Sequence, residues 1–288
     1  MNHTKFMQQA QDHLSKWIRT FHPNIEEGKF KYRNEWVKHS HILPLGDYAE
    51  KGRKEAIIAA IKQYNVLTDN VEFNSVALPI SELHTLGNHL TSSQILCYNF
   101  FGLLLGSQMS DNREIKISQD LRNWLIASFP NIPYVSENAK CQFEFKFGDH
   151  EGTSLDFCVM DDVATIMFEI KYTENGFAKA KNDKRHKDKF SSIYSKLLVQ
   201  QDTLRKNVPQ EVFFHDYQLF RNAIRTNDKC YAVFIFPENN KSCCTQFNRF
   251  LSSEWVINPS RLKSLTWENA FSNSVVTANS ELRKKYGL

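Results

Sequence analysis

Two kinds of hydrophobic segment are missing from this sequence of 288 residues. No run of about 18 apolar residues occurs, so we expect no membrane-spanning helix. The first residues, MNHTKFMQQAQDHL, lack the apolar stretch of a secretory signal peptide. These two absences predict a cytoplasmic protein that does not insert into a membrane.

The cysteines also lack a recognisable framework. No C-x-x-C pair occurs, and the adjacent pair Cys243-Cys244 is poorly spaced for a structural zinc site or a disulfide. Cys97, Cys141 and Cys230 lie in apolar or strand-like runs, as small core residues do. We therefore expect all six cysteines to be reduced, as in a reducing compartment.

The overall charge is close to balanced and excludes few partners. A net charge of +4 and a pI near 8.6 permit nucleic-acid binding without requiring it. The hydrophobic content of 41%, with 22 phenylalanines, is enough for a sizeable core and argues against disorder. The length allows one large domain or two small ones.

The stretch from Gly152 to Glu174 has the alternating pattern of two strands joined by a short turn. Leu155 and Phe157 share one face of the first strand, and we expect that face to point to the core. Glu169 and Lys171 share the polar face of the second strand.

The position of Asp156 depends on the turn between these strands. A turn of four residues sets Asp156 directly opposite Glu169, and a turn of two sets it diagonal to Glu169. A turn of three would bury Asp156 and expose Leu155 and Phe157, which the hydrophobic pattern excludes. The sequence therefore predicts two carboxylates and one ammonium, that of Lys171, on the polar face of a hairpin.

Such a group of side chains suits phosphodiester hydrolysis. Two neighbouring carboxylates repel each other, and Mg²⁺ or Mn²⁺ relieves that repulsion. A lysine beside the metal can hold or deprotonate a water and offset charge on the transition state. The alternative is a solvated Glu-x-Lys ion pair, worth under about 1 kcal/mol.

A third strand, Cys141–Gly148, precedes this hairpin and carries Glu144 among its polar residues. The loop that follows can bring Glu144 beside Asp156. There Glu144 is either an additional metal ligand or a cross-strand partner of Lys171 or Lys146. Both interpretations stay open.

Two further polar groups follow the hairpin. The basic run Lys179–Lys189 is either a solvated face or a contact for a phosphate backbone, through side chains that include Lys184, Arg185 and Lys187. In a predicted helix at 215–226, three polar residues share one face: Gln218, Arg221 and Asn222. They form either a surface stripe or a set in which Gln218 orders the site lysine or a water and Arg221 holds a phosphate.

Asp156 and the following Glu169-Ile170-Lys171 resemble the signature of the PD-(D/E)xK nuclease superfamily, although Leu155 stands where a proline is usual. The chain is more closely similar to a group of type II-like restriction endonucleases in that superfamily. That resemblance rests on three blocks in order, Ser92-Ser93-Gln94, Glu169–Glu174 (EIKYTE) and Gln218–Asn222 (QLFRN), and covers about residues 85 to 240.

The resemblance implies an α/β fold with a restriction-endonuclease-like αβββαβ core, in which helices flank a mixed central sheet. It implies that Asp156 and Glu169 bind Mg²⁺, with the Ile170 carbonyl in the inner shell and Mn²⁺ able to substitute. Lys171 would position or activate the water for in-line attack that leaves a 5′-phosphate and a 3′-hydroxyl. It also implies two further assignments: Ser93 and Gln94 as contacts to a phosphate or to the site, and Glu137 as an alternative to Glu144.

The remaining patterns predict the other elements and three regions of the chain. Helices are expected at 4–20, 47–64, 91–106, 118–129, 190–206, 246–252 and 260–271, a short strand at 70–79, and a buried strand at 231–237. A polar connector should lead through Trp36 to Pro44. We divide the chain into a mainly helical extension (1–85), a nuclease core (86–240) and a helical region packing on that core (241–288).

We therefore expect a Mg²⁺-dependent DNA endonuclease of restriction type that acts on double-stranded DNA. Two alternatives are a nuclease that reads the shape of branched or damaged DNA, and a non-catalytic nucleic-acid-binding protein with a nuclease fold. A homodimer is plausible because cutting both strands is simplest with two copies of one site. The first 85 residues could support the core, recognise a target or build a dimer interface.

Overall fold

Alternating apolar residues build the antiparallel centre of a six-stranded mixed sheet, from β4 (Lys140–Lys146), β5 (Ser154–Met160) and β6 (Thr165–Ile170). The computed structural model describes residues 3–46, 52–67, 71–109, 113–148, 151–272 and 280–288. Continuously apolar β7 (Cys230–Phe236) pairs parallel with β6, as expected for a strand buried on both faces. β8 (Leu262–Thr266) and β3 (Ile115–Lys116) form the edges.

The turn between β5 and β6 settles the register of the predicted hairpin. Met160 pairs with Thr165, so residues 161–164 form a four-residue turn. Phe157 pairs with Phe168, and the same register sets Asp156 directly opposite Glu169. The four-residue alternative is therefore confirmed.

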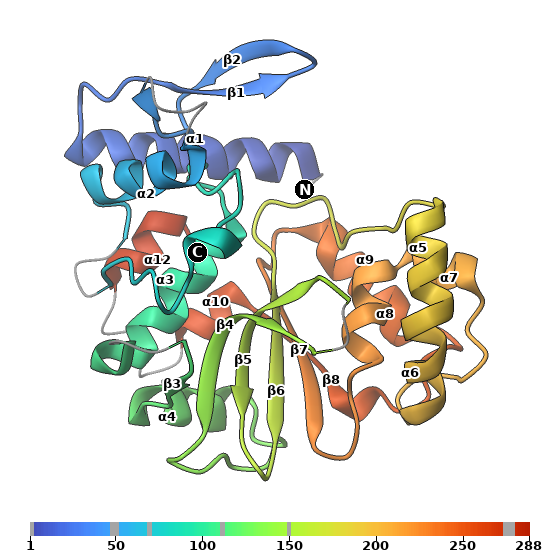
Figure 1. The fold of residues 1–288 in the computed structure, drawn as a ribbon. Helices are drawn as coiled ribbons and strands as arrows, with labels where there is room; N and C mark the ends of the chain where they lie inside the picture. The colour runs from blue at the N-terminus through green and yellow to red at the C-terminus, as the bar shows by residue number, and fades with distance from the viewer. Residues whose placement is uncertain (1–2, 47–51, 68–70, 110–112, 149–150, 273–279) are drawn as a thin grey trace.

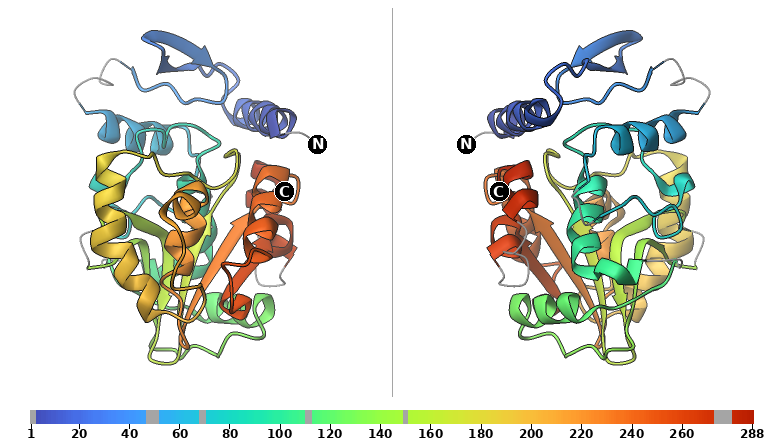
Figure 2. Two further views of the ribbon diagram at one scale, coloured as in Figure 1. Left: turned by 90° about the vertical axis from the view of Figure 1, so that its right-hand side faces the viewer. Right: turned by 90° about the vertical axis from the view of Figure 1, so that its left-hand side faces the viewer.

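Helices cover both faces of the sheet (Figures 1 and 2). On one face α3 (Ser93–Leu105), α4 (Gln119–Ser128), α10 (Trp267–Ser272) and α12 (Ser280–Tyr286) join one apolar cluster. On the other face lie α6 (Ser195–Gln200), α7 (Gln210–His215), α8 (Tyr217–Ala223) and α9 (Lys241–Leu251). This mixed α/β architecture is consistent with the restriction-endonuclease-like fold that the resemblance implies.

The alternative of a solvated Glu-x-Lys ion pair is wrong, because the second helical layer buries the polar face of the hairpin: Glu169 is 3% and Lys171 7% exposed. Cys158 and Met167 pack into that layer, while Phe157 packs into the opposite cluster. Leu155 lies with Cys158 rather than with Phe157, so the prediction that Leu155 and Phe157 share a core face is also wrong. The alternation of side chains between the two faces of β5 breaks at Asp156. There the Asp156 carboxylate, rather than a backbone carbonyl of β5, accepts the Ile170 N–H.

The first third of the chain holds a two-stranded ribbon where we predicted a connector. Helix α1 (His3–Phe21) is followed by β1 (Gly28–Tyr32) and β2 (Glu35–His39), which pair antiparallel. Helix α2 (Arg53–Gln63) is shorter than the predicted 47–64, of which residues 47–51 lie outside the described part. The predicted strand at 70–79 is wrong, since residues 71–79 form turns and irregular chain; residue 70 lies outside the described part.

Two segments that we predicted as single helices each consist of several elements in the structure. The segment expected at 190–206 begins earlier as α5 (Lys184–Lys189), continues through a π-helical turn (Phe190–Tyr194) and ends with α6 at Gln200. The Gln201 side chain accepts the N–H groups of Thr203 and Leu204 and so ends the helix. The segment 260–271 is a 3₁₀ turn (Pro259–Arg261), β8 and α10. Two further 3₁₀ turns are Ile80–Glu82 and Gly106–Met109.

All six cysteines are free, as expected. No helix among the described residues is long and apolar enough to cross a membrane.

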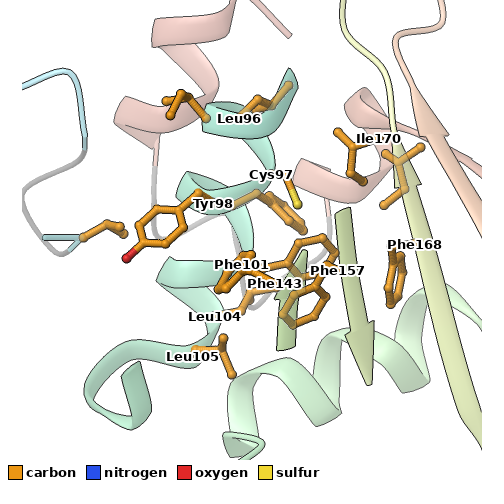
Figure 3. Close-up of a cluster of buried hydrophobic side chains, with 14 of the residues drawn as sticks. Leu96, Cys97, Tyr98, Phe101, Leu104, Leu105, Phe143, Phe157, Phe168 and Ile170 are labelled. Atoms are coloured by element: carbon orange, nitrogen blue, oxygen red, sulfur yellow. The ribbon is translucent and has the colours of Figure 1, made fainter. Parts of the chain in front are cut away.

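Phe101 of α3 lies at the centre of the apolar cluster between α3 and the sheet (Figure 3). Its ring stacks on Phe157 with centroids 4.1 Å apart and contacts Phe168 at 5.0 Å and Trp124 at 5.7 Å. This side chain joins the helix to two of the strands that carry the candidate site.

We predict that Phe101→Ala lowers the free energy of unfolding by about 3–5 kcal/mol, because it leaves a cavity that the stacked rings cannot fill. Urea denaturation followed by circular dichroism measures the change. Phe21→Ala is the matched control, since the Phe21 side chain is 58% exposed and its loss should cost about 0.5 kcal/mol or less. Similar losses in both variants would contradict this description of the core.

Candidate active site

The predicted acidic and basic side chains meet at the end of the sheet where β6 ends and β5 begins. Figure 1 shows β6 running from the β5–β6 turn toward the end of the molecule that carries α1. Asp156 near the start of β5 lies opposite Glu169 near the end of β6, and Lys171 follows directly after β6. The structure thus brings together three residues that are 15 positions apart or less in the sequence.

Asp156 is held by the main chain of the neighbouring strand. Its Oδ2 accepts the N–H of Ile170 at 2.6 Å, and within the described residues no hydrogen bond reaches Oδ1. Although the residue is only partly buried, desolvation of the carboxyl group and then the charge of Glu169 raise its pKa well above the usual range. Asp156 is therefore a carboxylate held close to another carboxylate.

Glu169 is a buried carboxylate with four side-chain donors. Lys171 Nζ donates to Oε1 at 2.7 Å, and the Gln218 amide donates to the same oxygen. Asn222 Nδ2 and Arg221 Nη2 donate to Oε2 at 2.8 Å and 3.2 Å. Burial raises the pKa of Glu169, but the charges of Lys171 and Arg221 and these hydrogen bonds outweigh burial and lower its pKa.

Lys171 is buried and paired with Glu169. Desolvation lowers the pKa of its ammonium group, but the charges of Glu169, Glu174 and Asp156 outweigh desolvation and raise it. Lys171 is therefore a proton-bearing cation in this arrangement, and it can donate hydrogen bonds and offset negative charge.

Helix α8 supplies the other three donors to Glu169 from one face, as the i, i+3, i+4 spacing predicts. Asp216 lies at the break between α7 and α8 and accepts hydrogen bonds from Gln246 at 2.9 Å and Arg249 at 2.6 Å. Gln218 also accepts the Ala178 N–H at 3.1 Å, so it ties the loop after β6 to the site.

The functional interpretation of this helix face agrees only partly with where its residues lie. Gln218 and Lys171 both donate to Glu169 Oε1, so the Gln218 amide lies next to the Lys171 ammonium. Arg221 is buried and donates to Glu169 and to the Ser154 carbonyl at 3.3 Å, and Asn222 is only 2% exposed. Contact of Arg221 and Asn222 with nucleic acid therefore stays a prediction, and in this structure both stabilise Glu169.

Glu144 lies on β4 directly across from Asp156 in the register. It has a φ of 49°, in the left-handed region that non-glycine residues rarely adopt. Its Oε1 accepts from Gln94 Nε2 at 2.6 Å, and its Oε2 accepts from the Ser154 hydroxyl. Burial raises its pKa. Both oxygens thus have protein partners, and a role as metal ligand remains a prediction.

The remaining predicted residues lie at varied distances from this centre. Ser92 caps α3 and Ser93 begins it, while Gln94 is buried and orients Glu144. Lys184, Arg185 and Lys187 are exposed on α5, at the end of the loop that leaves β6. Glu137 is exposed, and its neighbour Ser136 bonds Asp161 in the β5–β6 turn, at the opposite end of the sheet. Glu137 is therefore far from Asp156, and this alternative to Glu144 is wrong.

A buried network behind the site was missed in the sequence. Glu151 is 2% exposed and pairs with Arg225 at 2.6 Å and with the Tyr194 hydroxyl at 2.7 Å. Burial lowers the pKa of Arg221, but the charge of Glu169 and then that of Glu151 outweigh burial and raise it. Arg225 lies four residues after Arg221 and inside the predicted helix at 215–226, and that spacing was the available signal, although α8 itself ends at Ala223. Glu151 itself follows no strand or helix pattern.

The oxygen atoms at this end of the sheet are the candidate ligands of a small divalent cation. Among the described residues no group of three or more His, Cys, Asp or Glu side chains could hold a metal ion. Mg²⁺ does not need such a group, since one or two carboxylates with waters suffice. The Ile170 N–H points toward Asp156, so its carbonyl faces the same side of the strand. The candidate ligands are therefore the carboxylates of Asp156 and Glu169 and the carbonyl of Ile170.

A six-stranded mixed sheet with helices on both faces is consistent with a restriction-endonuclease-like fold. The model of one such family, Restriction Endonuclease associating with ARP, matches residues 11–287, and the chain belongs to that family. The match supports the restriction-endonuclease resemblance and, at that level, a nuclease. No curated protein and no solved structure matches the chain.

The two opposed carboxylates should affect stability with opposite signs. Without divalent ions, we predict that Asp156→Asn raises the free energy of unfolding by roughly 1–2 kcal/mol, because it removes repulsion of Glu169 and keeps an acceptor for Ile170. Glu169→Gln should lower it by about 3–5 kcal/mol, because Lys171 and Arg221 lose their buried partner. Guanidinium denaturation in EDTA at pH 8 measures both.

The gain from Asp156→Asn should depend on pH. The folded-state pKa of Asp156 is raised, so its charge destabilises the wild type fully above that pKa, and the cost declines as pH falls from there toward the lower pKa of the unfolded chain. The difference in the free energy of unfolding between Asp156→Asn and the wild type should therefore become smaller as the pH is lowered. If Asp156→Asn is less stable than the wild type at pH 8, the Asp156 and Glu169 carboxylates do not destabilise the folded protein by repulsion, and the prediction is wrong.

Proposed function

We propose that the protein is a Mg²⁺-dependent DNA endonuclease of restriction type, in the PD-(D/E)xK superfamily. The observation that carries this proposal is the register of the hairpin, which sets Asp156 opposite Glu169 with Lys171 paired beside them. The family supplies the support for a nuclease and for DNA as the substrate.

Asp156 and Glu169 would hold Mg²⁺ together with the Ile170 carbonyl, and Mn²⁺ could replace it. When bound, the cation supplies Lewis-acid activation of a phosphodiester oxygen and of a coordinated water. All four lone-pair positions of Glu169 are used by protein donors. Glu169 must therefore release one donor to hold a cation.

Lys171 is the donor whose release would serve catalysis. Its ammonium already neutralises Glu169 in this structure, and it keeps its proton there. Once freed from Oε1, Nζ can donate to the attacking water or to a phosphate oxygen and offset charge that develops during in-line displacement. Gln218, fixed by Ala178, retains the orientation of Glu169 meanwhile. The products would carry a 5′-phosphate and a 3′-hydroxyl.

Duplex DNA would pass the end of the sheet where α5 lies. Lys184, Arg185 and Lys187 are exposed there and can contact phosphates, while Ser93 and Gln94 lie at the N-terminus of α3. A homodimer would present two sites to the two strands. Sequence specificity and a cytoplasmic location belong to the same proposal.

Lys171→Ala should reduce plasmid cleavage in Mg²⁺ by about a hundredfold or more, because the attacking water loses its positioning group. Asp156→Asn should also abolish cleavage, although we expect it to be the more stable protein. Gel assays of supercoiled plasmid, with EDTA as the metal-free comparison, measure both effects. Binding of uncut duplex in EDTA should persist in Lys171→Ala.

Lys206→Ala is the matched control for a lost lysine, since Lys206 is exposed and far along the chain from the site. It should cut as the wild type does. Normal cleavage by Lys171→Ala would refute the assigned role of this lysine. Absence of cleavage by the wild type with every divalent ion and plasmid, despite DNA binding, would favour the non-catalytic alternative.

A further inference from the structure

The two-stranded ribbon β1–β2 stands out from the body of the protein beyond α1, in Figure 1 and in both views of Figure 2. It lies toward the same end of the sheet as the candidate active site. Its sequence, GKFKYRNEWVKH, holds four basic side chains, at Lys29, Lys31, Arg33 and Lys38, and one acidic side chain, at Glu35. The ribbon is therefore far more basic than the chain as a whole.

The register sorts these residues onto two different faces. Lys29 pairs with Lys38 and Lys31 pairs with Trp36, so three lysines and a tryptophan share one face, and all four are exposed. The other face carries Phe30 paired with Val37, both partly buried. One face thus points to solvent with a cationic, aromatic surface.

The cationic face takes part in no ion pair with the part of the chain that the structure describes. Within the described residues, none of the four basic side chains of the ribbon takes part in an ion pair, and Lys29 lies directly across from Lys38. Like charges at directly opposite positions destabilise a strand pair. By contrast, Lys140 on the main sheet, across from Lys116, is paired with Glu114 at 2.7 Å. A polyanion would relieve the repulsion in the ribbon.

The tip and the base make the ribbon rigid. Arg33 and Asn34 form a two-residue turn with φ of 46° and 70°, the left-handed pair of a type I′ hairpin. A Cβ on Gly28 would lie 2.4 Å from the Leu43 carbonyl oxygen, so the base is pressed against the main chain. Phe30 contacts the rings of His39 and His89 at 5.4 Å and 5.6 Å.

We infer that the β1–β2 ribbon is a DNA-docking element that enters the major groove with its lysine face against the phosphates. This inference rests on the proposed function, which supplies DNA as the substrate. The major groove of B-DNA admits a two-stranded ribbon, and lysines on neighbouring strands can reach phosphates. Lysines on both open edges also oppose edge-to-edge pairing with a second copy of the chain.

The test is binding of the full chain to a fluorescein-labelled DNA duplex in EDTA, measured by anisotropy over a range of salt concentrations. Lys29→Ala/Lys31→Ala/Lys38→Ala should weaken binding roughly tenfold or more. It should also lower the slope of log affinity against log salt by about 2 to 3, close to 0.9 for each lost phosphate contact. Lys116→Ala/Lys196→Ala/Lys206→Ala removes three exposed lysines outside the ribbon and should change neither quantity.

The outcomes separate this inference from the proposed function. Wild-type protein that binds no duplex DNA would overturn the DNA substrate and the docking element together. Wild-type binding that the ribbon variant retains, with an unchanged slope and an unchanged circular dichroism melt, would overturn the docking element alone. Duplex RNA, whose deep major groove excludes a ribbon, should show little dependence on the three lysines. An equal dependence would overturn entry into the groove.

Discussion

The buried carboxylate of Glu169 is the constraint on which the arrangement of the site depends. An ionised carboxyl group can be buried only when donors surround it, and the protein brings two cations and two amides to this one side chain. Three of the four donors come from α8, so this helix must lie over the end of β6. The burial of Glu169 therefore fixes both the second helical layer and the direction of Lys171.

The segment that follows β6 is fastened from both sides of the sheet. Trp267 of α10 donates to the Lys171 carbonyl at 2.9 Å, and the Tyr172 hydroxyl donates to the Tyr286 carbonyl at 2.7 Å. Asn240 bonds the carbonyls of Tyr172 and Glu174. Elements from the last 50 residues thus hold the main chain around Lys171, so the point from which its side chain extends is fixed.

The sequence was most informative where a short-range rule determines the geometry. The two-residue period and the hydrophobic pattern restricted the register of Asp156 against Glu169, and the i, i+4 spacing placed Gln218 and Asn222 on one face. The sequence was least informative about burial. A strand face that carries acidic residues is normally interpreted as exposed to solvent. No local sequence pattern shows that α8 covers this face. The ribbon was missed because Arg33-Asn34 lacks the glycine that usually marks its turn, and β8 because its five residues have no clean alternation.

The central claim is that Asp156 and Glu169 form one cation site, and the most direct measurement is the effect of Mg²⁺ on unfolding. The account predicts that the wild type gains about 1.4 kcal/mol for each tenfold rise in Mg²⁺ above the dissociation constant, whereas Asp156→Asn gains nothing. Equal stabilisation of both proteins, or of neither, would contradict it.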